Sequence, residues 1–218
     1  MIIKRISTSF LIAMIVVPAF CQNSEQSLRV SHRDSVSDYK FRVSTPWLSF
    51  VNFGGEKTNT HHYELHFKNN LDSKNIIGVK FATWRLFQPM GILWWDGLLE
   101  KIESQSEFYP GYLRETGIGV SYQRMLWKGL FATAEILPQL KTYLDENNNK
   151  IGNGFKLYMS YHLGYHVTLF NGRMFLEPQI HSQYWPIDTN TPQSFKEIDD
   201  TWNNYFLLEP NLYIGVKF

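Results

Sequence analysis

The sequence predicts an all-β fold: an eight-stranded antiparallel transmembrane β-barrel with a filled polar interior. Apolar and polar residues alternate along many segments, which is the pattern of strands with one apolar and one polar face. Aromatic residues make up 16% of the chain while the mean hydropathy is only −0.28, so apolar residues are dispersed rather than gathered into long runs. The connections between the expected strands alternate between short and long, as they do in transmembrane barrels.

The N-terminal segment has the features of a secretory signal peptide. Lys4 and Arg5 precede an apolar run at 10–19, and this run is shorter than the roughly 20 residues that a membrane-spanning helix needs. Ala19 supplies a small residue close to the expected cleavage point. We therefore expect residues 1–21 to be removed during export.

The removal of Cys21 with this segment leaves a chain without cysteine, which excludes disulfides and thiolate zinc sites. Acylation of Cys21 as a lipoprotein is the alternative. Basic residues fall from 21 to 19 against 20 acidic ones, so the net charge becomes about −1, and no basic face for nucleic acid is expected. Residues 22–39 are predicted to form a flexible periplasmic leader and residues 40–218 the barrel.

The pair Asn171-Gly172 predicts a two-residue type I′ turn, because this turn needs positive φ at both positions. Flanking residues then face each other wherever their numbers add to 343. One face of this hairpin is apolar, and the other carries the pairs Thr168–Phe175, His166–Glu177, His162–His181, Ser160–Gln183 and Tyr158–Trp185. Cross-strand neighbours lie about 5 Å apart, so His166 and Glu177 are expected to form a charged hydrogen-bonded pair.

A second hairpin is predicted around residues 127–129, where Gly129 suits the left-handed position of a three-residue loop. Facing residues then have numbers that add to 256. The polar face of this hairpin pairs Gln123 with Thr133, Ser121 with Glu135 and Glu115 with Lys141. An opposite-charge pair that follows from turn chemistry alone supports the register.

The chain ends in one more alternating segment, whose apolar face carries Leu208, Pro210, Leu212, Ile214, Val216 and Phe218. Together with the hairpins it completes eight expected strands. Their ranges are 40–52, 61–69, 75–88, 115–126, 130–143, 154–170, 173–187 and 204–218. Pro138, Pro178 and Pro210 fall inside these strands, and because proline lacks the backbone donor we expect local bulges there.

The long connection 89–114 contains the segment LWWDGLLEKIES, which has the spacing of an amphipathic helix. Its apolar side carries Trp94, Trp95, Leu98, Leu99 and Ile102. The segment is predicted to be either a lid or lipid-surface helix, or a loop helix packed on the barrel rim.

By alternation, ionisable side chains are expected to point into the barrel. An eight-stranded barrel is only just wide enough for its interior to be filled by side chains, and buried charges must be paired. The main prediction is an interior network of ion pairs that closes the lumen. Its principal members are His166, Glu177, Glu135, Glu209, Lys141 and Glu115, and the wider inward set adds Lys80, Gln123, Gln139, Lys156, Gln179 and Lys217.

A barrel that binds a metal ion or a small solute through its inward histidines is an alternative. The segment HHYELH places His62, Glu64 and His66 on one strand face, and His162 with His181 supplies further imidazoles. Alternate histidines on a strand can share a zinc ion. This spacing is unspecific, and no cofactor is predicted.

Enzymatic chemistry on lipid A is a second alternative, because some outer-membrane barrels use a histidine and a serine for it. Here His181 and Ser182 are adjacent, so alternation sends them to opposite faces, whereas a nucleophile and its base must lie within about 3 Å. No catalytic residue is therefore assigned.

The alternating last strand that ends on phenylalanine resembles the terminal segment of Gram-negative outer-membrane barrels. Over residues 40–218 the chain resembles the OmpA- and OmpX-like class of small outer-membrane barrels. Within that class it resembles the diverse set found in Bacteroidota-type bacteria. The resemblance implies an outer-membrane protein that acts as a non-enzymatic scaffold or surface interaction module. Its expected partners are outer-membrane lipid and, through loops 89–114 and 188–203, other outer-membrane or extracellular proteins.

Overall fold

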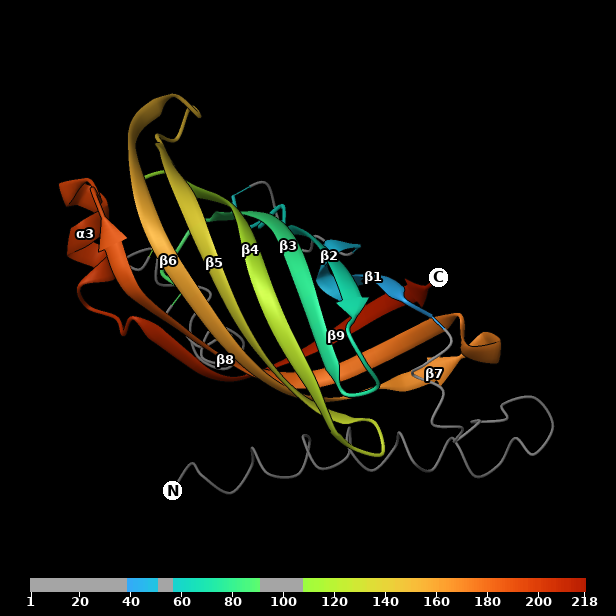
Figure 1. The fold of residues 1–218 in the computed structure, drawn as a ribbon. Helices are drawn as coiled ribbons and strands as arrows, with labels where there is room; N and C mark the ends of the chain where they lie inside the picture. Colours follow the sequence, from blue (N-terminus) through green and yellow to red (C-terminus); the bar gives the residue numbers. More distant parts are fainter. Residues whose placement is uncertain (1–38, 51–56, 91–107) are drawn as a thin grey trace, which may run out of the picture. The chain divides into compact units, whose positions relative to one another are not determined.

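The computed structural model describes residues 39–50, 57–90 and 108–218, which form antiparallel strands and a few short helices (Figure 1). In chain order these are β1 (Phe41–Pro46), the 3-10 helix η1 (Trp47–Ser49), β2 (Tyr63–Asn70), β3 (Asn75–Leu86), β4 (Tyr112–Trp127), β5 (Leu130–Leu144), β6 (Lys150–Tyr165), β7 (Val167–Leu169), the 3-10 helix η3 (Phe170–Gly172), β8 (Met174–Thr189), the α-helix α3 (Gln193–Asp199) and β9 (Tyr205–Lys217). No helix in the described ranges is long and apolar enough to cross a membrane.

The strands close into a ring. The sheet order is β6-β5-β4-β3-β2-β1-β9-β8-β7, and an additional pairing of β6 with β8 joins its ends. β7 follows β6 after a break at His166, whose N–H donates to the Gly129 carbonyl at 2.8 Å, and both β6 and β7 pair with β8. The nine segments therefore act as eight barrel strands, which confirms the predicted fold class.

The hairpin at Asn171-Gly172 has the predicted register and turn. Pairs such as His162–His181 and Leu169–Met174 keep the sum of 343. Asn171 and Gly172 have φ of 57° and 95°, as the type I′ turn requires.

Further along the same ladder, the prediction that Tyr158 and Trp185 face each other is wrong. The register shifts between Leu157 and Met159, because Trp185 and Pro186 together oppose Tyr158 alone. Tyr158 and Trp185 nevertheless both point inward and pack in the same buried cluster.

The hairpin between β4 and β5 has the predicted register but a shorter loop. Pairs from Glu115–Lys141 to Met125–Phe131 keep the sum of 256. The loop itself is the two-residue turn Lys128-Gly129, with φ of 45° and 94°, and Leu126 forms a bulge in place of a third loop residue. A bulge with one extra residue gives this tight turn the same register as the predicted loop.

Of the local bulges predicted at the three prolines, those at Pro138 and Pro178 are wrong. Pro138 pairs with Leu157, and Pro178 pairs with Leu212, without a shift in register. The missing N–H of Pro138 is instead accommodated by a gap in the β4–β5 ladder, which skips Ile118 and Gly119. Near Pro210 a shift does occur, and it is centred on β9 at Leu207 and Leu208, where Leu208 has a φ of 60°.

The first strand is shorter than the predicted range 40–52. β1 ends at Pro46, and η1 follows it, because the Phe50 N–H donates back to the Trp47 carbonyl at 3.0 Å. Elsewhere β4 begins at Tyr112 and β6 at Lys150, both earlier than expected. The predictions for residues 1–38, including the signal peptide, concern residues outside the described ranges.

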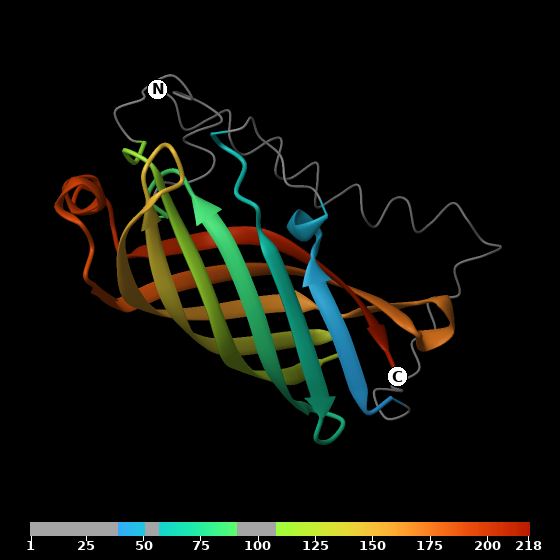
Figure 2. The same ribbon diagram turned by 90° about the horizontal axis from the view of Figure 1, so that it is seen from above.

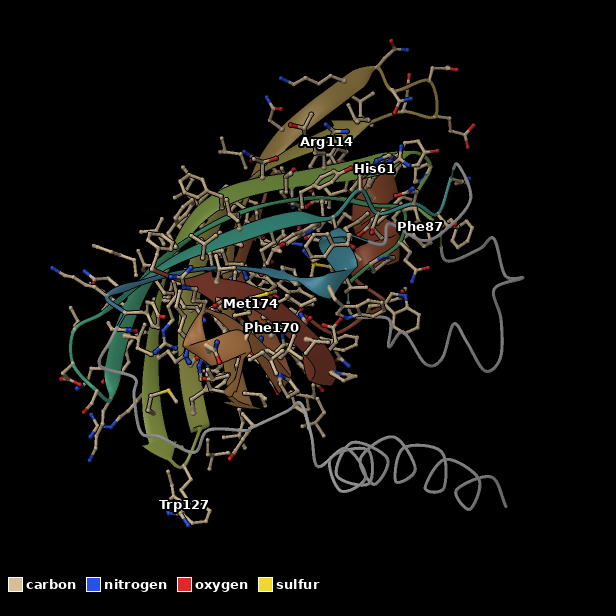
Figure 3. The ribbon with its side chains drawn as sticks, turned by 90° about the vertical axis from the view of Figure 1, so that its right-hand side faces the viewer. His61, Phe87, Arg114, Trp127, Phe170 and Met174 are labelled. Carbon is tan, nitrogen blue, oxygen red and sulfur yellow. The ribbon has the colours of Figure 1, made fainter. Side chains whose placement is uncertain are left out.

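The barrel has two ends of different character (Figures 1 and 2). The turn end carries the short connections 71–74, 128–129 and 170–173, together with the C-terminus, where the Phe41 N–H donates to the Phe218 carbonyl at 2.9 Å. The loop end carries α3 and the longer connections. In Figure 3, His61 and Arg114 lie near the loop end, whereas Trp127 projects at the turn end.

The outer and inner faces of the strands differ as strongly as the ends. Outward positions are exposed and apolar, with Ile118 and Val120 each 60% exposed and Leu140 70% exposed. Inward positions hold the buried charges described below. This arrangement is the inverse of a water-soluble sandwich, whose apolar face looks inward.

Candidate functional site: the charged interior of the barrel

The middle of the interior holds a compact ion-pair network, called here the central cluster: Glu64, Glu135, Lys80, His66 and His162. Lys80 Nζ lies 2.9 Å from Glu135 Oε2 and 3.3 Å from Glu64 Oε2. His66 Nε2 lies 2.6 Å from Glu64 Oε1, and His162 Nε2 lies 3.5 Å from Glu135 Oε2. Each carboxylate is therefore surrounded by several donors, and two carboxylates share one lysine.

The strand motif proposed for metal binding is occupied by hydrogen bonds. Glu64 lies between His62, at 3.4 Å, and His66, and it also accepts a hydrogen bond from the Tyr213 hydroxyl. Within residues 39–50, 57–90 and 108–218, no three histidine, cysteine or carboxylate side chains are grouped so that they could hold a metal ion. The geometry thus gives this motif an electrostatic use.

The histidine pair predicted across the hairpin at Asn171-Gly172 does meet in the interior. The rings of His162 and His181 lie 5.0 Å apart at 76°. They bind different groups, because His181 Nε2 lies 2.6 Å from Glu209 Oε2 while His162 contacts Ser160 and Glu135. Gln183 donates to the same Glu209 oxygen at 2.5 Å.

At the turn end, a second group of charges surrounds one carboxylate. This turn-end cluster consists of Arg42, Lys68, Lys217, His166 and Glu177. Glu177 is fully buried and lies 2.9 Å from His166 Nδ1, 3.2 Å from Lys68 Nζ and 3.8 Å from Arg42 Nη1. The pair His166–Glu177, read from the turn chemistry, is thus in contact.

At the loop end, the predicted pair of Glu115 and Lys141 face each other in the ladder but bind other partners. Glu115 accepts from Trp84 Nε1 at 2.7 Å and lies 2.5 Å from Lys156 Nζ. Lys141 instead donates to Asp188 and, at 3.0 Å, to Thr191. Asp188 falls in the predicted loop 188–203, so its approach to Lys141 does not follow from hairpin pairing.

The two loops predicted to meet partners touch each other at this end. Phe195 of α3 is fully buried, and its ring centroid lies 4.8 Å from that of Tyr109 and 5.0 Å from that of Tyr143. The Tyr109 hydroxyl donates to Asp199. Burial raises the pKa of Asp199 above its ordinary value, and burial together with the Asp199 charge raises the pKa of Tyr109 well above its own.

The predicted loop helix lies outside the described residues, so Trp94, Trp95, Leu98, Leu99 and Ile102 are not placed. Beside the described part of the loop, a cavity of about 710 Å³ opens between α3 and the end of β8, and its lining includes Tyr109, Trp185, Asp199 and Trp202. A second cavity, of about 370 Å³, extends from Met90 down to Glu64, His181 and Glu209.

The interior also contains a serine, a histidine and a carboxylate in contact. Ser160 Oγ lies 2.9 Å from His162 Nε2 and 3.2 Å from Glu135 Oε2. Ser160 is almost completely buried, and neither it nor His162 lines the 370 Å³ cavity. His181 and Ser182 lie on opposite faces of β8, with His181 buried inside, as alternation predicts.

Several interior residues were missed by the sequence reasoning. Lys68 continues the alternation Glu64, His66, Lys68 along β2, so this signal was present. Arg42 and Ser44 likewise occupy inward positions of β1, where the pattern is too short to stand out. For the contact of Tyr213 with Glu64, the sequence offers no signal except that Tyr213 occupies an inward position in the alternation of the last strand.

An apolar outer surface, a charged interior and antiparallel strands closed into a ring define a transmembrane β-barrel of the outer-membrane type. No protein-family model and no curated protein matches this chain. Among solved structures, the Yersinia pestis outer membrane protein Ail in a phospholipid bilayer nanodisc matches with a TM-score of 0.45 and 11% sequence identity, covering 83% of this chain and 100% of that chain.

Proposed function

We propose that this protein is an outer-membrane β-barrel without enzymatic activity, which serves as a scaffold and presents its loop end to partners. The observation that carries the proposal is the combination of a charge-filled interior with an apolar exterior. The signal peptide 1–21 would direct its export, and outer-membrane lipid would surround its strands.

The exterior supports contact with lipid. Large apolar side chains such as Leu140, Ile118 and Leu163 are exposed on the outer faces of β5, β4 and β6, whereas the charged side chains of the same strands point inward. Exposed apolar surface at this scale on a water-soluble monomer would be an aggregation hazard, whereas in a bilayer it is the expected outer face.

The interior supports a scaffold rather than an open pore. Lys80 links Glu64 on β2 to Glu135 on β5, and Lys68 on β2 reaches Glu177 on β8. These contacts cross the ring from one strand to distant ones, so the side chains fill its cross-section. An eight-stranded barrel leaves little room beyond such filling.

The loop end supports interaction with partners because its surface is held in place. The Phe195 side chain anchors α3 between Tyr109 and Tyr143, and the Tyr109 hydroxyl binds Asp199. Loops 89–114 and 188–203 therefore form one joint surface at their described residues. A preordered surface loses less conformational entropy on binding than two free loops would.

The test combines folding, conductance and capture. We expect the purified chain to fold only with detergent or lipid and to give no discrete steps in planar-bilayer recordings. A pull-down from detergent-solubilised membranes should yield a partner that is lost with Phe195→Ala and kept with Trp127→Ala, a matched aromatic change at the turn end (Figure 3). Folding in plain buffer, discrete conductance steps, or equal capture by both variants would each refute the proposal.

A further inference from the structure

Three basic side chains lie side by side at the turn end of the interior. In the β1–β9 ladder Arg42 pairs with Lys217, and in the β1–β2 ladder the same Arg42 pairs with Lys68. All three residues are buried, at 1%, 7% and 6% exposure respectively. Like charges directly opposite each other on neighbouring strands destabilise a sheet, so this row needs compensation.

Compensation from the protein itself is incomplete. Within the described part of the chain, Glu177 is the one carboxylate in ion-pair contact with this row, through Lys68 at 3.2 Å and Arg42 at 3.8 Å. Glu177 also contacts the His166 imidazole and accepts a hydrogen bond from the Gln123 side chain at 3.2 Å. One carboxylate therefore faces three cations.

Buried hydrogen-bond donors without acceptors also indicate that this row lacks negatively charged partners. The Nε, Nη1 and Nη2 atoms of Arg42 are buried and make no hydrogen bond, and neither does the buried Ser44 hydroxyl, two residues along β1. A guanidinium carries five N–H donors and is always charged, and leaving it buried without acceptors is costly. Water would satisfy donors but would leave the excess positive charge, so an anion fits both observations.

We propose that the turn end of the barrel interior binds a small inorganic anion, such as chloride, between Arg42 and Lys217. The guanidinium N–H groups and the Ser44 hydroxyl donate to the anion, and Lys217 adds charge from the adjacent strand. Lys217 Nζ donates to Thr168 at 3.0 Å, so its ammonium is held at this level of the barrel. Lys217 is the last residue of β9 and pairs with Arg42 near the turn end, so the anion reaches the site from that end of the barrel.

The first experiment compares chloride with gluconate at constant ionic strength, in non-ionic detergent. Gluconate is a bulky organic anion, so it provides the same ionic strength without a small inorganic anion. We expect the thermal unfolding midpoint to rise saturably with chloride, by about 5 to 10 °C at 100 times the Kd, because a ligand that binds only the folded state stabilises it by mass action. Crystals grown in bromide should show an anomalous peak beside Arg42.

The variants separate specific binding from general salt effects. Arg42→Met should unfold at the same midpoint in both salts, and in gluconate it should be more stable than the parent because the repulsion within the row is relieved. If Arg42→Met does not fold, Lys217→Met provides the same comparison. Arg124→Met is the matched control, since Arg124 is exposed on the outer face of β4 and should keep the full chloride effect.

The outcomes are decisive in either direction. A chloride-dependent midpoint that is lost in Arg42→Met or Lys217→Met and kept in Arg124→Met supports the anion site. Equal midpoints of the parent protein in chloride and gluconate, or a bromide-grown crystal without an anomalous peak at Arg42, would overturn it. These results are independent of conductance and partner capture, so they do not depend on the function proposed above.

Discussion

The central and turn-end clusters of the interior both combine glutamate, lysine and histidine, but they differ in the balance of positive and negative charge. In the central cluster two carboxylates, Glu64 and Glu135, share Lys80 and two histidines. In the turn-end cluster a single carboxylate, Glu177, faces Arg42 and Lys68, with Lys217 beyond them. The difference teaches that a closed barrel interior can be balanced locally in one layer and depend on an outside ion in another.

The largest expected effect comes from removing the only carboxylate of the turn-end cluster. Glu177→Gln keeps the shape of the side chain and leaves three buried cations without a countercharge. Breaking a buried ion pair by removing one partner costs about 3 to 5 kcal/mol, and we expect a loss in unfolding free energy of about 5 kcal/mol here. Denaturant unfolding in detergent measures it, and Glu197→Gln on the exposed face of α3 should stay within about 0.5 kcal/mol of the parent.

The matching change in the central cluster should cost less. Glu135→Gln removes one of two carboxylates around Lys80, and Glu64 remains at 3.3 Å to neutralise it. We expect a loss of about 3 kcal/mol, part of which the double variant with Lys80→Met should restore. If the Glu135 variant were less stable than the Glu177 variant, the two clusters would not differ in the way described.

The smallest expected effect concerns the loop end, where the buried carboxylate of Asp199 can be neutralised by binding a proton. Burial, with the nearby Asp188 charge, raises the pKa of Asp199 above its ordinary value of 3.8. The docked form of α3 therefore binds a proton more tightly than the undocked form, so docking is firmest at low pH and weakens as pH rises through the raised pKa. NMR signals of the Phe195 ring, followed from about pH 3 to about pH 8, should report this change.

A variant without the titrating group gives the control for this last prediction. Asp199→Asn should make the Phe195 signals independent of pH over the same range, while the Tyr109 contact is kept. A pH response that survives in this variant would assign the titration to another group.

The sequence predicts the eight strands and the register of two hairpins because turn chemistry and alternation act locally. Asn171-Gly172 and Gly129 each specify positive φ, and the register follows by counting outward. The bulge opposite Tyr158 is not among the predicted ones, although Pro186 lies in it and lacks the backbone N–H that a ladder position uses. Local patterns therefore define pairing near a turn and lose it beyond the first irregularity.

The interior is predictable as a set of residues but not as a set of pairs. Alternation along each strand predicts correctly that Glu115 and Lys141 point inward. Because neighbouring strands are staggered, however, Glu115 forms its ion pair with Lys156, and Lys141 forms its ion pair with Asp188. Contacts across the lumen, such as Lys68 with Glu177, depend on the closure of the ring. Sequence separation carries no information on such contacts, which is why the turn-end cluster was not foreseen as a unit.

The length of the first strand has a mechanical consequence. β1 has six residues, whereas β4, β6 and β8 have sixteen each, and the cylinder is joined between β1 and the final strand. A pulling force or a thermal fluctuation will separate the barrel strands most easily at this short β1–β9 pairing. The β1–β9 pairing is thus expected to form last when the barrel closes during assembly. Its backbone amides should be the first barrel amides to show local opening by hydrogen exchange.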